Sequence, residues 1–219
     1  LPIAIAITIA TELRKGVLCR GTFTYREHNS GAQGNETFVD PDTDDAHELI
    51  LSAAEFLVSR GEQVLVFLGD KKRTTGYAAM LAKRLRAPSA EEAIEELLEQ
   101  EESLSQAQLR ETLTSSVAFH NADLSLEQRR LVEHYFRLGK IKVLFSTSTL
   151  AMGMNLPVQN VIIDLDRRGF LVEIGKWGML AVSKSTYENE SGRAGRPGLS
   201  SGVARSILVT SSPFQAEAW

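Results

Sequence analysis

Two arginines near the end of the chain, Arg193 and Arg196, have the type and spacing to bind an anion. Each directly follows a glycine in the stretch G-R-A-G-R-P-G, and a glycine leaves the backbone open to close approach by a ligand. On one helical turn, residues three apart lie on the same side, so both guanidinium groups would point the same way. Because guanidinium groups are permanently charged forks that match phosphate oxygens, the stretch favours a polyphosphate ligand. The alternative is a basic helix end followed by a Pro-Gly turn.

The composition is that of an ordinary globular protein. The chain has 219 residues, of which 43% are hydrophobic and 24% are charged, enough for one large domain or two small ones. The net charge of -4 gives no overall cationic field, so any nucleic acid must bind to a local basic patch. One cysteine, Cys19, excludes a disulfide framework within the chain and fits a reducing compartment.

The apolar start of the chain, residues 1–10, is too short to span a bilayer and lacks the flanks of a signal peptide. We therefore expect no membrane partner and a cytoplasmic location, with the nucleoid or the nucleus as alternatives. The chain also lacks an initiator Met, so we expect it to be a fragment of a longer protein.

Short apolar runs alternate with amphipathic stretches from about residue 41 onward. The apolar runs predict buried strands at 63–68, 116–120, 142–146, 159–165 and 202–210. The amphipathic stretches predict helices that end near residues 59, 86, 102, 113 and 138, the last of them opened by a capping box of Ser125 and Gln128. This alternation predicts a three-layer α/β domain with a parallel sheet over residues 41–219.

Two segments depart from this alternation. Residues 1–40 are expected to form an extended or linker segment, with a loop at 29–35 because Gly, Ser and Asn are frequent there. Residues 166–182 carry apolar side chains at mostly even spacing around three glycines, which predicts an inserted β-hairpin. The helix leading to the arginines would then be capped by Ser183, Ser185 or Thr186, and the first helix of the domain by Asp42 or Thr43.

The carboxyl ends of parallel strands share one edge of a sheet, where ligands usually bind. Residues 70–73, His120 and residues 147–155 each follow a predicted strand, so we expect them to meet at that edge. Lys71 and Lys72 open a helix against its dipole, which is favourable if an anion binds there and is otherwise a solvated basic turn.

Two of these stretches carry a resemblance to a known family. S-T-S-T-L-A-M-G-M-N-L-P at 146–157 and G-R-A-G-R-P-G at 192–198 together resemble the C-terminal signature motifs of superfamily 2 (DEAD/DEAH-box) helicases. The form T-x-T-L-A-x-G-x-N-L-P is similar to the superkiller-like branch. Q-V-L-V-F-L at 63–68 and V-A-F-H-N-A-D-L-S-L-E-Q-R-R at 117–130 resemble further segments of that branch, in the same order. The resemblance covers about residues 48–210.

The resemblance implies the second of the two RecA-like domains of an ATP-dependent nucleic-acid helicase or translocase. ATP with Mg²⁺ would bind between this chain and the protein's own N-terminal RecA-like domain, and single-stranded DNA or RNA would cross both domains. The phosphate loop G-x-x-x-x-G-K-[ST] does not occur in the sequence, so the chain alone should be inactive. No metal site is expected within the chain, because the Mg²⁺ ligands would come from the other domain.

The resemblance also implies roles for individual residues. Arg196 would be the arginine finger that neutralises charge on the γ-phosphoryl group in the transition state, and Arg193 would hold the same phosphates in the ground state. The nucleotide would be lined by Gly153, Asn155 and Gly192. The nucleic-acid phosphates would contact Thr147, Thr149, Lys71, Lys72 and His120.

Several of these residues keep a second interpretation. Thr147 and Thr149 could simply be β-branched residues at a strand end, and His120 could be a core histidine. The whole chain could also be a non-catalytic RecA-like scaffold that binds nucleic acid or a partner. A third reading is an α/β domain that binds a small nucleotide or transfers a group.

The sequence also departs from the family pattern at two places. Asn189 and Glu190 stand where the family usually has Gln-Met before the arginine motif. Asn121-Ala122-Asp123 replaces His-Ala-Gly, which adds a negative charge near the proposed nucleic-acid track.

Overall fold

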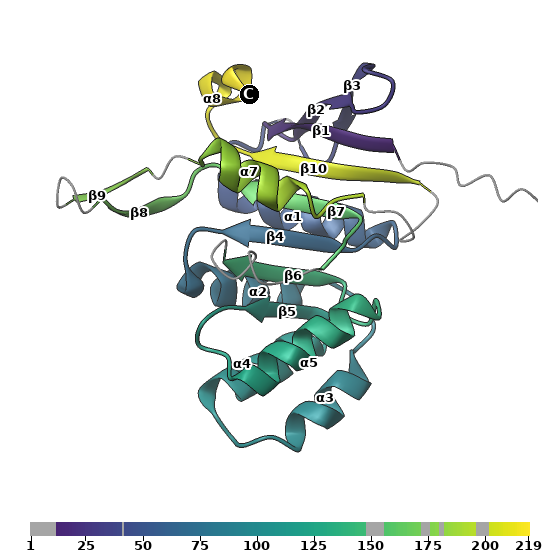
Figure 1. The fold of residues 1–219 in the computed structure, drawn as a ribbon, viewed down its shortest axis with the longest axis vertical. Coiled ribbons are helices and arrows are strands. Elements are labelled where there is room, and N and C mark those ends of the chain that lie inside the picture. Colours follow the sequence, from purple (N-terminus) through teal and green to yellow (C-terminus); the bar gives the residue numbers. More distant parts are fainter. Residues whose placement is uncertain (1–11, 41, 148–155, 172–175, 180–181, 196–201) are drawn as a thin grey trace, which may run out of the picture.

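The computed structural model describes residues 12–40, 42–147, 156–171, 176–179, 182–195 and 202–219. They form an α/β fold around an eight-stranded sheet in the order β3-β2-β1-β10-β7-β4-β6-β5 (Figure 1). Six neighbouring strands of this sheet run parallel to one another: β1, β10, β7, β4, β6 and β5. β2 and β3 are antiparallel to their neighbours. The strand bounds are β1 Glu12–Cys19, β2 Thr22–Glu27, β3 Gln33–Thr37, β4 Val64–Leu68, β5 Val117–His120, β6 Val143–Thr147, β7 Asn160–Asp164 and β10 Val203–Val209.

Helices cover both faces of this sheet, as the buried strands require. Every residue of β4, β6 and β7 is buried, which is typical of parallel strands with helices on either side. In Figure 1, α5 and α7 lie in front of the sheet and α1 and α2 lie behind it. The helix bounds are α1 Ala46–Ser59, α2 Lys71–Arg84, α3 Glu91–Leu98, α4 Leu104–Leu113, α5 Leu126–Arg137, α7 Lys184–Ser191 and α8 Pro213–Ala218. The predicted three-layer α/β architecture is therefore confirmed.

The capping predictions were right for two helices and wrong for one. Ser125 accepts the Gln128 N–H at 3.1 Å, and the Gln128 side chain accepts the Ser125 N–H at 3.1 Å, so the capping box of α5 is complete. Ser183 caps α7 as predicted. The first helix is capped by Asp45, whose carboxylate accepts the His47 N–H at 3.2 Å, because the acidic run before it forms a turn.

The acidic helix predicted over residues 90–102 is shorter than expected. It forms α3 and ends at Leu98. The Gln106 side-chain amide donates to the carbonyls of Leu97 and Gln100, at 2.9 and 3.1 Å. This amide of α4 thus satisfies one carbonyl in the last turn of α3 and one just beyond it, so the chain can turn there at little cost.

The amino-terminal segment extends the main sheet. β1 pairs in parallel with β10, and residues 33–35, which we predicted to be a loop, belong to edge strand β3. The boundary that we placed at residue 40 therefore falls between parts of one continuous sheet. The composition of 29–35 favours a loop, but pairing with β2 outweighs this local preference, since strand formation depends on cross-strand neighbours.

A buried ionic network ties this segment to the parallel strands. The Arg205 side chain on β10 is only 2% exposed and forms ion pairs with Glu36 of β3, at 3.1 Å, and with Glu62, at 2.9 Å. Asn160, at the start of β7, contacts both the Arg205 guanidinium and the Glu62 carboxylate. Charges so deeply buried must be paired, and here the pairing links four strands or strand ends.

The predicted hairpin is present as a separate two-stranded sheet. β8 Arg168–Leu171 and β9 Lys176–Met179 pair antiparallel, with Gly169 opposite Gly178. Figure 1 shows the two strands extending away from the main sheet, between β7 and α7 in the chain order.

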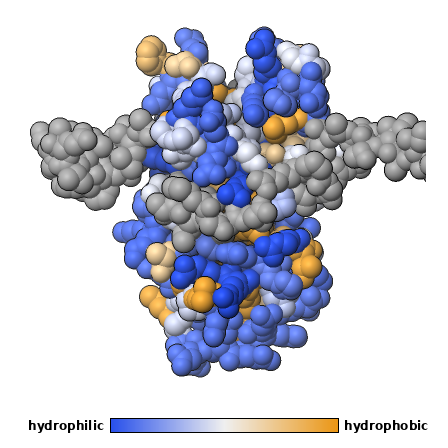
Figure 2. Space-filling model, in the orientation of Figure 1, coloured by the Kyte–Doolittle hydropathy of each residue, from blue (hydrophilic) through white to orange (hydrophobic). Residues whose placement is uncertain are grey.

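One face of the molecule is mostly polar. The face shown in Figure 2 is predominantly hydrophilic, with hydrophobic residues scattered over it. Among the residues that the structure describes, no helix has the length and apolar character needed to cross a membrane.

Candidate functional site

Three strands bring the predicted nucleic-acid residues to one edge of the sheet. β6 lies between β4 and β5, and the register places Leu68 beside Thr147 and His120 beside Ser146. The carboxyl ends of all three strands are therefore level. The prediction that the segments after these strands meet at one edge is confirmed for the described residues. Thr149, Gly153 and Asn155 lie outside them.

The start of α2 presents two cations at this edge. Asp70 caps the helix, since its carboxylate accepts the Arg73 N–H at 2.9 Å. Lys71 and Lys72 follow it and are both exposed. The Lys71 Nζ lies 2.6 Å from Asp123 Oδ1, whereas Lys72 forms no ion pair with any described residue. This helix end therefore offers ammonium groups at the surface, where an anion can reach them.

Asn121 fixes the loop after β5 against the first turn of α2. Its side chain is fully buried, and its amide donates to the Lys71 carbonyl, at 3.2 Å, and to the Thr74 hydroxyl, at 2.9 Å. Its side-chain oxygen accepts the Asp123 N–H at 2.9 Å. Sequence reasoning noted Asn121 only as a departure from the family pattern. Its positioning role depends on contacts across about fifty residues of chain, which no local pattern contains.

His120 is a core residue in this structure. It is 1% exposed, and its Nε2 lies 2.9 Å from Glu133 Oε1. Burial lowers the pKa of the ring, and the Glu133 carboxylate opposes that shift. A buried and largely neutral ring offers no cationic contact to a nucleic-acid phosphate. The structure thus favours the core interpretation of His120 over the phosphate contact in the predicted track.

Thr147 ends β6 between the two flanking loops, and 9% of its surface is exposed. This small exposure leaves both readings of the sequence open. It satisfies the need of β6 for a β-branched residue, and it stands at the edge where a phosphate contact is expected.

A second set of charges holds the base of the hairpin. The Arg167 guanidinium donates to the Glu190 carboxylate at 2.7 and 3.3 Å, and both side chains are buried. Arg167 Nε also donates to the Asp164 carbonyl at 2.8 Å. Glu190, which stands in place of the family's Met, therefore ties α7 to the residue before β8. This ion pair therefore connects the base of the hairpin to the last turn of α7, just before the arginine segment.

Arg73 turns inward, away from the cations that precede it. Its guanidinium lies 2.6 Å from Asp164 Oδ2 and donates to the Tyr77 hydroxyl at 2.9 Å. Burial raises the pKa of the Asp164 carboxyl, and Arg73 opposes that shift. Burial also raises the pKa of Tyr77 to about 12. The sequence placed Arg73 only within the segment 70–73 at this edge, because a basic run alone does not show which member has a buried partner.

The arginine segment begins beyond the end of α7. The helix ends at Ser191 with Gly192 as its cap, so Arg193 does not share a helical turn with the residues after it, contrary to the expectation from spacing. Ala194 instead forms a parallel backbone bridge with Val158, and the Gly195 N–H donates to the Val158 carbonyl at 3.0 Å. Gly195 has φ +70°, which a glycine adopts at no steric cost.

The two signature stretches are therefore joined by backbone. Val158 directly follows the stretch 146–157, and its N–H donates to the Arg193 carbonyl at 3.1 Å. Arg193 is 8% exposed, and Gly192 is exposed. Arg196 lies outside the described residues.

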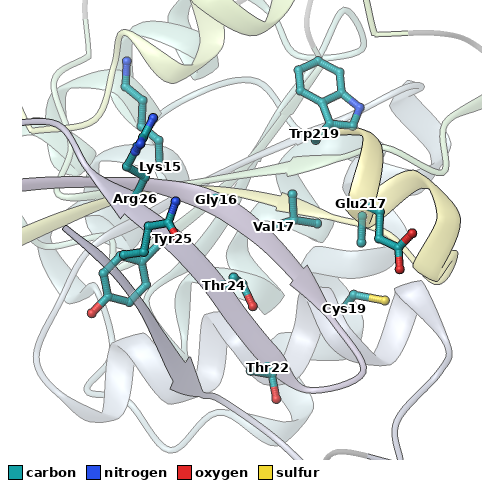
Figure 3. A pocket seen from close by; sticks show the side chains of 12 residues that line it. Lys15, Gly16, Val17, Cys19, Thr22, Thr24, Tyr25, Arg26, Glu217 and Trp219 are labelled. Atoms are coloured by element: carbon teal, nitrogen blue, oxygen red, sulfur yellow. The ribbon is translucent and has the colours of Figure 1, made fainter. Parts of the chain in front are cut away.

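Two hollows lie apart from the track residues. One, of about 450 Å³, opens along β1 and β2 beside α8, where Lys15, Val17, Cys19, Thr24 and Trp219 line it (Figure 3). A second, of about 540 Å³, includes Gly192, Tyr187 and Trp219. Within the described residues, no group of three or more His, Cys, Asp or Glu side chains has an arrangement that could hold a metal ion.

Comparison with known proteins places this fold in a family. Residues 46–198 match the helicase conserved C-terminal domain. The chain belongs to the superfamily 2 helicases. It matches their C-terminal domain, and the resemblance drawn from its two signature stretches is confirmed.

The relatives of this helicase domain carry the same description. The chain is 39% identical over 166 residues to the ATP-dependent DNA helicase Hel308 of Pyrobaculum calidifontis, covering 73% of this chain and 23% of that protein. It is 34% identical over 217 residues to the protein of that name in Caldivirga maquilingensis, covering 94% of this chain and 26% of that one. For the Pyrococcus horikoshii protein the identity is 31% over 205 residues, covering 92% and 26%. The chain thus spans about a quarter of the length of the curated relatives that it matches.

Proposed function

We propose that this chain is the C-terminal RecA-like domain of an ATP-dependent DNA helicase, where it supplies the arginine finger and part of the single-strand track. The observation that carries the proposal is the backbone bridge between Val158 and Ala194. It brings together two stretches that are far apart in the sequence and that, in the resemblance, both face the nucleotide. A basic helix end that binds no ligand would not need to pair with the segment at Val158.

The arginine segment would act on ATP held between this chain and an N-terminal RecA-like domain. Arg196 would neutralise the charge that develops on the transferred phosphoryl group, and Arg193 would hold the same phosphates before reaction. Mg²⁺ would arrive with ATP and take its protein ligands from the other domain. The bond from the Gly195 N–H to the Val158 carbonyl supports this role, since it anchors the chain directly before the proposed finger.

The carboxyl edge of the sheet would hold the single strand. Lys71 and Lys72 provide exposed cations, and Thr147 ends the strand between them and the loop after β5. Cations and hydroxyls along a strand edge are the usual partners of backbone phosphates, which are bound without reading sequence. The relatives named as DNA helicases favour DNA over RNA.

The test is ATP hydrolysis by the full-length protein with no polynucleotide, with single-stranded DNA and with single-stranded RNA. We expect single-stranded DNA to stimulate turnover, and we expect Lys72→Met to raise the DNA concentration needed for half-maximal stimulation. Lys140→Met, which removes an exposed lysine in the turn after α5, away from this edge, is the control and should leave the DNA stimulation unchanged. Stimulation by RNA alone would assign the other substrate. No hydrolysis under any condition would favour the non-catalytic scaffold.

A further inference from the structure

One of the two exposed lysines at the track already has an anionic partner. The Lys71 ammonium lies 2.6 Å from the Asp123 carboxylate, and the two side chains are 59% and 51% exposed. Lys71 follows β4 and Asp123 follows β5, and these are the strands that flank β6. The ion pair therefore connects the segments on either side of the strand that ends in Thr147.

The backbone of Asp123 is held in place by the structure around it. The Asp123 N–H is bound by the Asn121 side chain, which is itself fully buried against the first turn of α2. The nearest acidic residue on the helix, Asp70, uses its carboxylate to cap α2. Asp123 is thus presented to Lys71 by an anchored loop, so its backbone loses little conformational freedom when the pair forms.

An exposed pair of this kind is weak and exchanges readily with other ions. A polynucleotide phosphate that approaches Lys71 meets a carboxylate bound to the same ammonium group. It must either displace Asp123 or bind without the help of Lys71. Both routes reduce the affinity of this edge for the strand.

We propose that Asp123 competes with a backbone phosphate for the ammonium group of Lys71 and so limits the affinity of the track for single-stranded DNA. This inference rests on the proposed function, because it requires the phosphate backbone to pass along this edge. A motor that moves along a strand must release each phosphate in turn. A competing carboxylate that is already in position favours that release.

The experiment measures binding of labelled single-stranded DNA to the full-length protein by fluorescence anisotropy over a range of salt concentrations. Asp123→Asn keeps the shape of the side chain and the backbone bond to Asn121. We expect it to tighten binding roughly two- to fivefold at low salt, the size of a released exposed ion pair. The plot of log affinity against log salt should steepen by up to about 0.7, one further phosphate contact on a single strand.

Glu92→Gln is the matched control. Glu92 pairs with Lys140 at 2.7 Å, and its exposure is similar, but it stands on α3 rather than at the carboxyl edge. This variant should leave DNA affinity unchanged. A gain equal to that of Asp123→Asn would mean that any lost negative charge tightens binding, and it would overturn the proposal.

The double variant separates competition from simple repulsion. In a Lys71→Met background, competition predicts that Asp123→Asn has little effect, since the contested ammonium is gone. An equal or larger gain there would overturn the proposal in favour of repulsion between Asp123 and the strand.

Lys72→Met distinguishes a failure of the proposed competition from a failure of the proposed DNA track. If it weakens DNA binding while Asp123→Asn does not change it, the track stands and only the competition is wrong. If Lys71→Met and Lys72→Met both leave binding unchanged, the track itself is wrong, and the competition falls with it.

Discussion

Two sets of ion pairs in this domain use the same chemistry in opposite ways. Around Arg205, guanidinium and carboxylate groups are sealed between β3, β10 and the start of β7, and the arginine side chain is 2% exposed. At the carboxyl edge, Lys71 and Asp123 form a pair in which both side chains are more than half exposed. The first set joins elements of the fold, and the second lies where a ligand can replace one partner.

Burial accounts for the difference. A charge without water must keep its partner, because losing the partner leaves an uncompensated charge in the interior. A charge at the surface is solvated whether or not it is paired, so its pair contributes little and is free to exchange. The amino-terminal extension and the track are therefore built from similar residues but differ in what a substitution should do.

The largest effect on stability is expected at the buried network. Arg205→Met removes the guanidinium that Glu36 and Glu62 share and leaves each carboxylate with one more exposed partner, Arg14 or Arg60. It should lower the free energy of unfolding by about 3 kcal/mol, the lower end of the cost of breaking a buried pair. Urea unfolding of this chain measures it. Arg110→Met, at an exposed arginine of α4, should stay within about 0.5 kcal/mol of the parent. A loss below about 1 kcal/mol at Arg205 would mean that the network does not hold the extension in place.

An intermediate effect is expected from pH at the buried His120. Burial lowers the pKa of the folded ring below that of the unfolded chain, so the unfolded state binds the proton more readily. Stability from this group is complete above about pH 6.5 and is lost as the pH falls below it, by at most about 1.4 kcal/mol per unit.

His120→Gln isolates this contribution, because the other three histidines remain in both proteins. Unfolding free energies measured between pH 7.5 and 5 should fall less steeply for His120→Gln than for the parent chain. Parallel curves for the two proteins would show that the ring is not desolvated, and would restore His120 as a candidate surface contact.

The smallest effect on stability is expected at the exposed pair. Asp123→Asn should change the free energy of unfolding by no more than about 1 kcal/mol, the usual ceiling for exposed pairs. The same urea titration measures it beside Arg205→Met. A loss comparable with that of Arg205→Met would place Asp123 among the structural charges and remove the contrast between the two sets.

Much of the fold could be predicted from local patterns. The central strands are continuous apolar runs, and Ser125 with Gln128 predicts the capping box of α5. The even spacing of apolar residues in 166–182 predicts the hairpin. Such signals depend on residues close together in the chain. Helix α8 and strand β3 were missed because short segments at an edge take their conformation from what they pack or pair with.

The site was predicted less completely, for a related reason. The ends of β4, β5 and β6 meet at one edge as expected, but the partners of the side chains were not visible in the sequence. Arg73 pairs with Asp164 across more than ninety residues, and Asn121 reaches back to α2. The spacing of the two arginines suggested a shared helical turn, yet the helix ends at Ser191 and Ala194 bridges to Val158 instead.

The central claim is that the arginine segment acts on ATP in a DNA-stimulated motor. The most direct test is the rate of ATP hydrolysis by the full-length Arg196→Ala protein at saturating single-stranded DNA, beside Arg110→Ala as the control. We predict a loss of about 10³-fold or more for Arg196→Ala, with DNA affinity nearly unchanged, and parent activity for the control. An Arg196→Ala protein that is folded and hydrolyses ATP at the parent rate would contradict the claim.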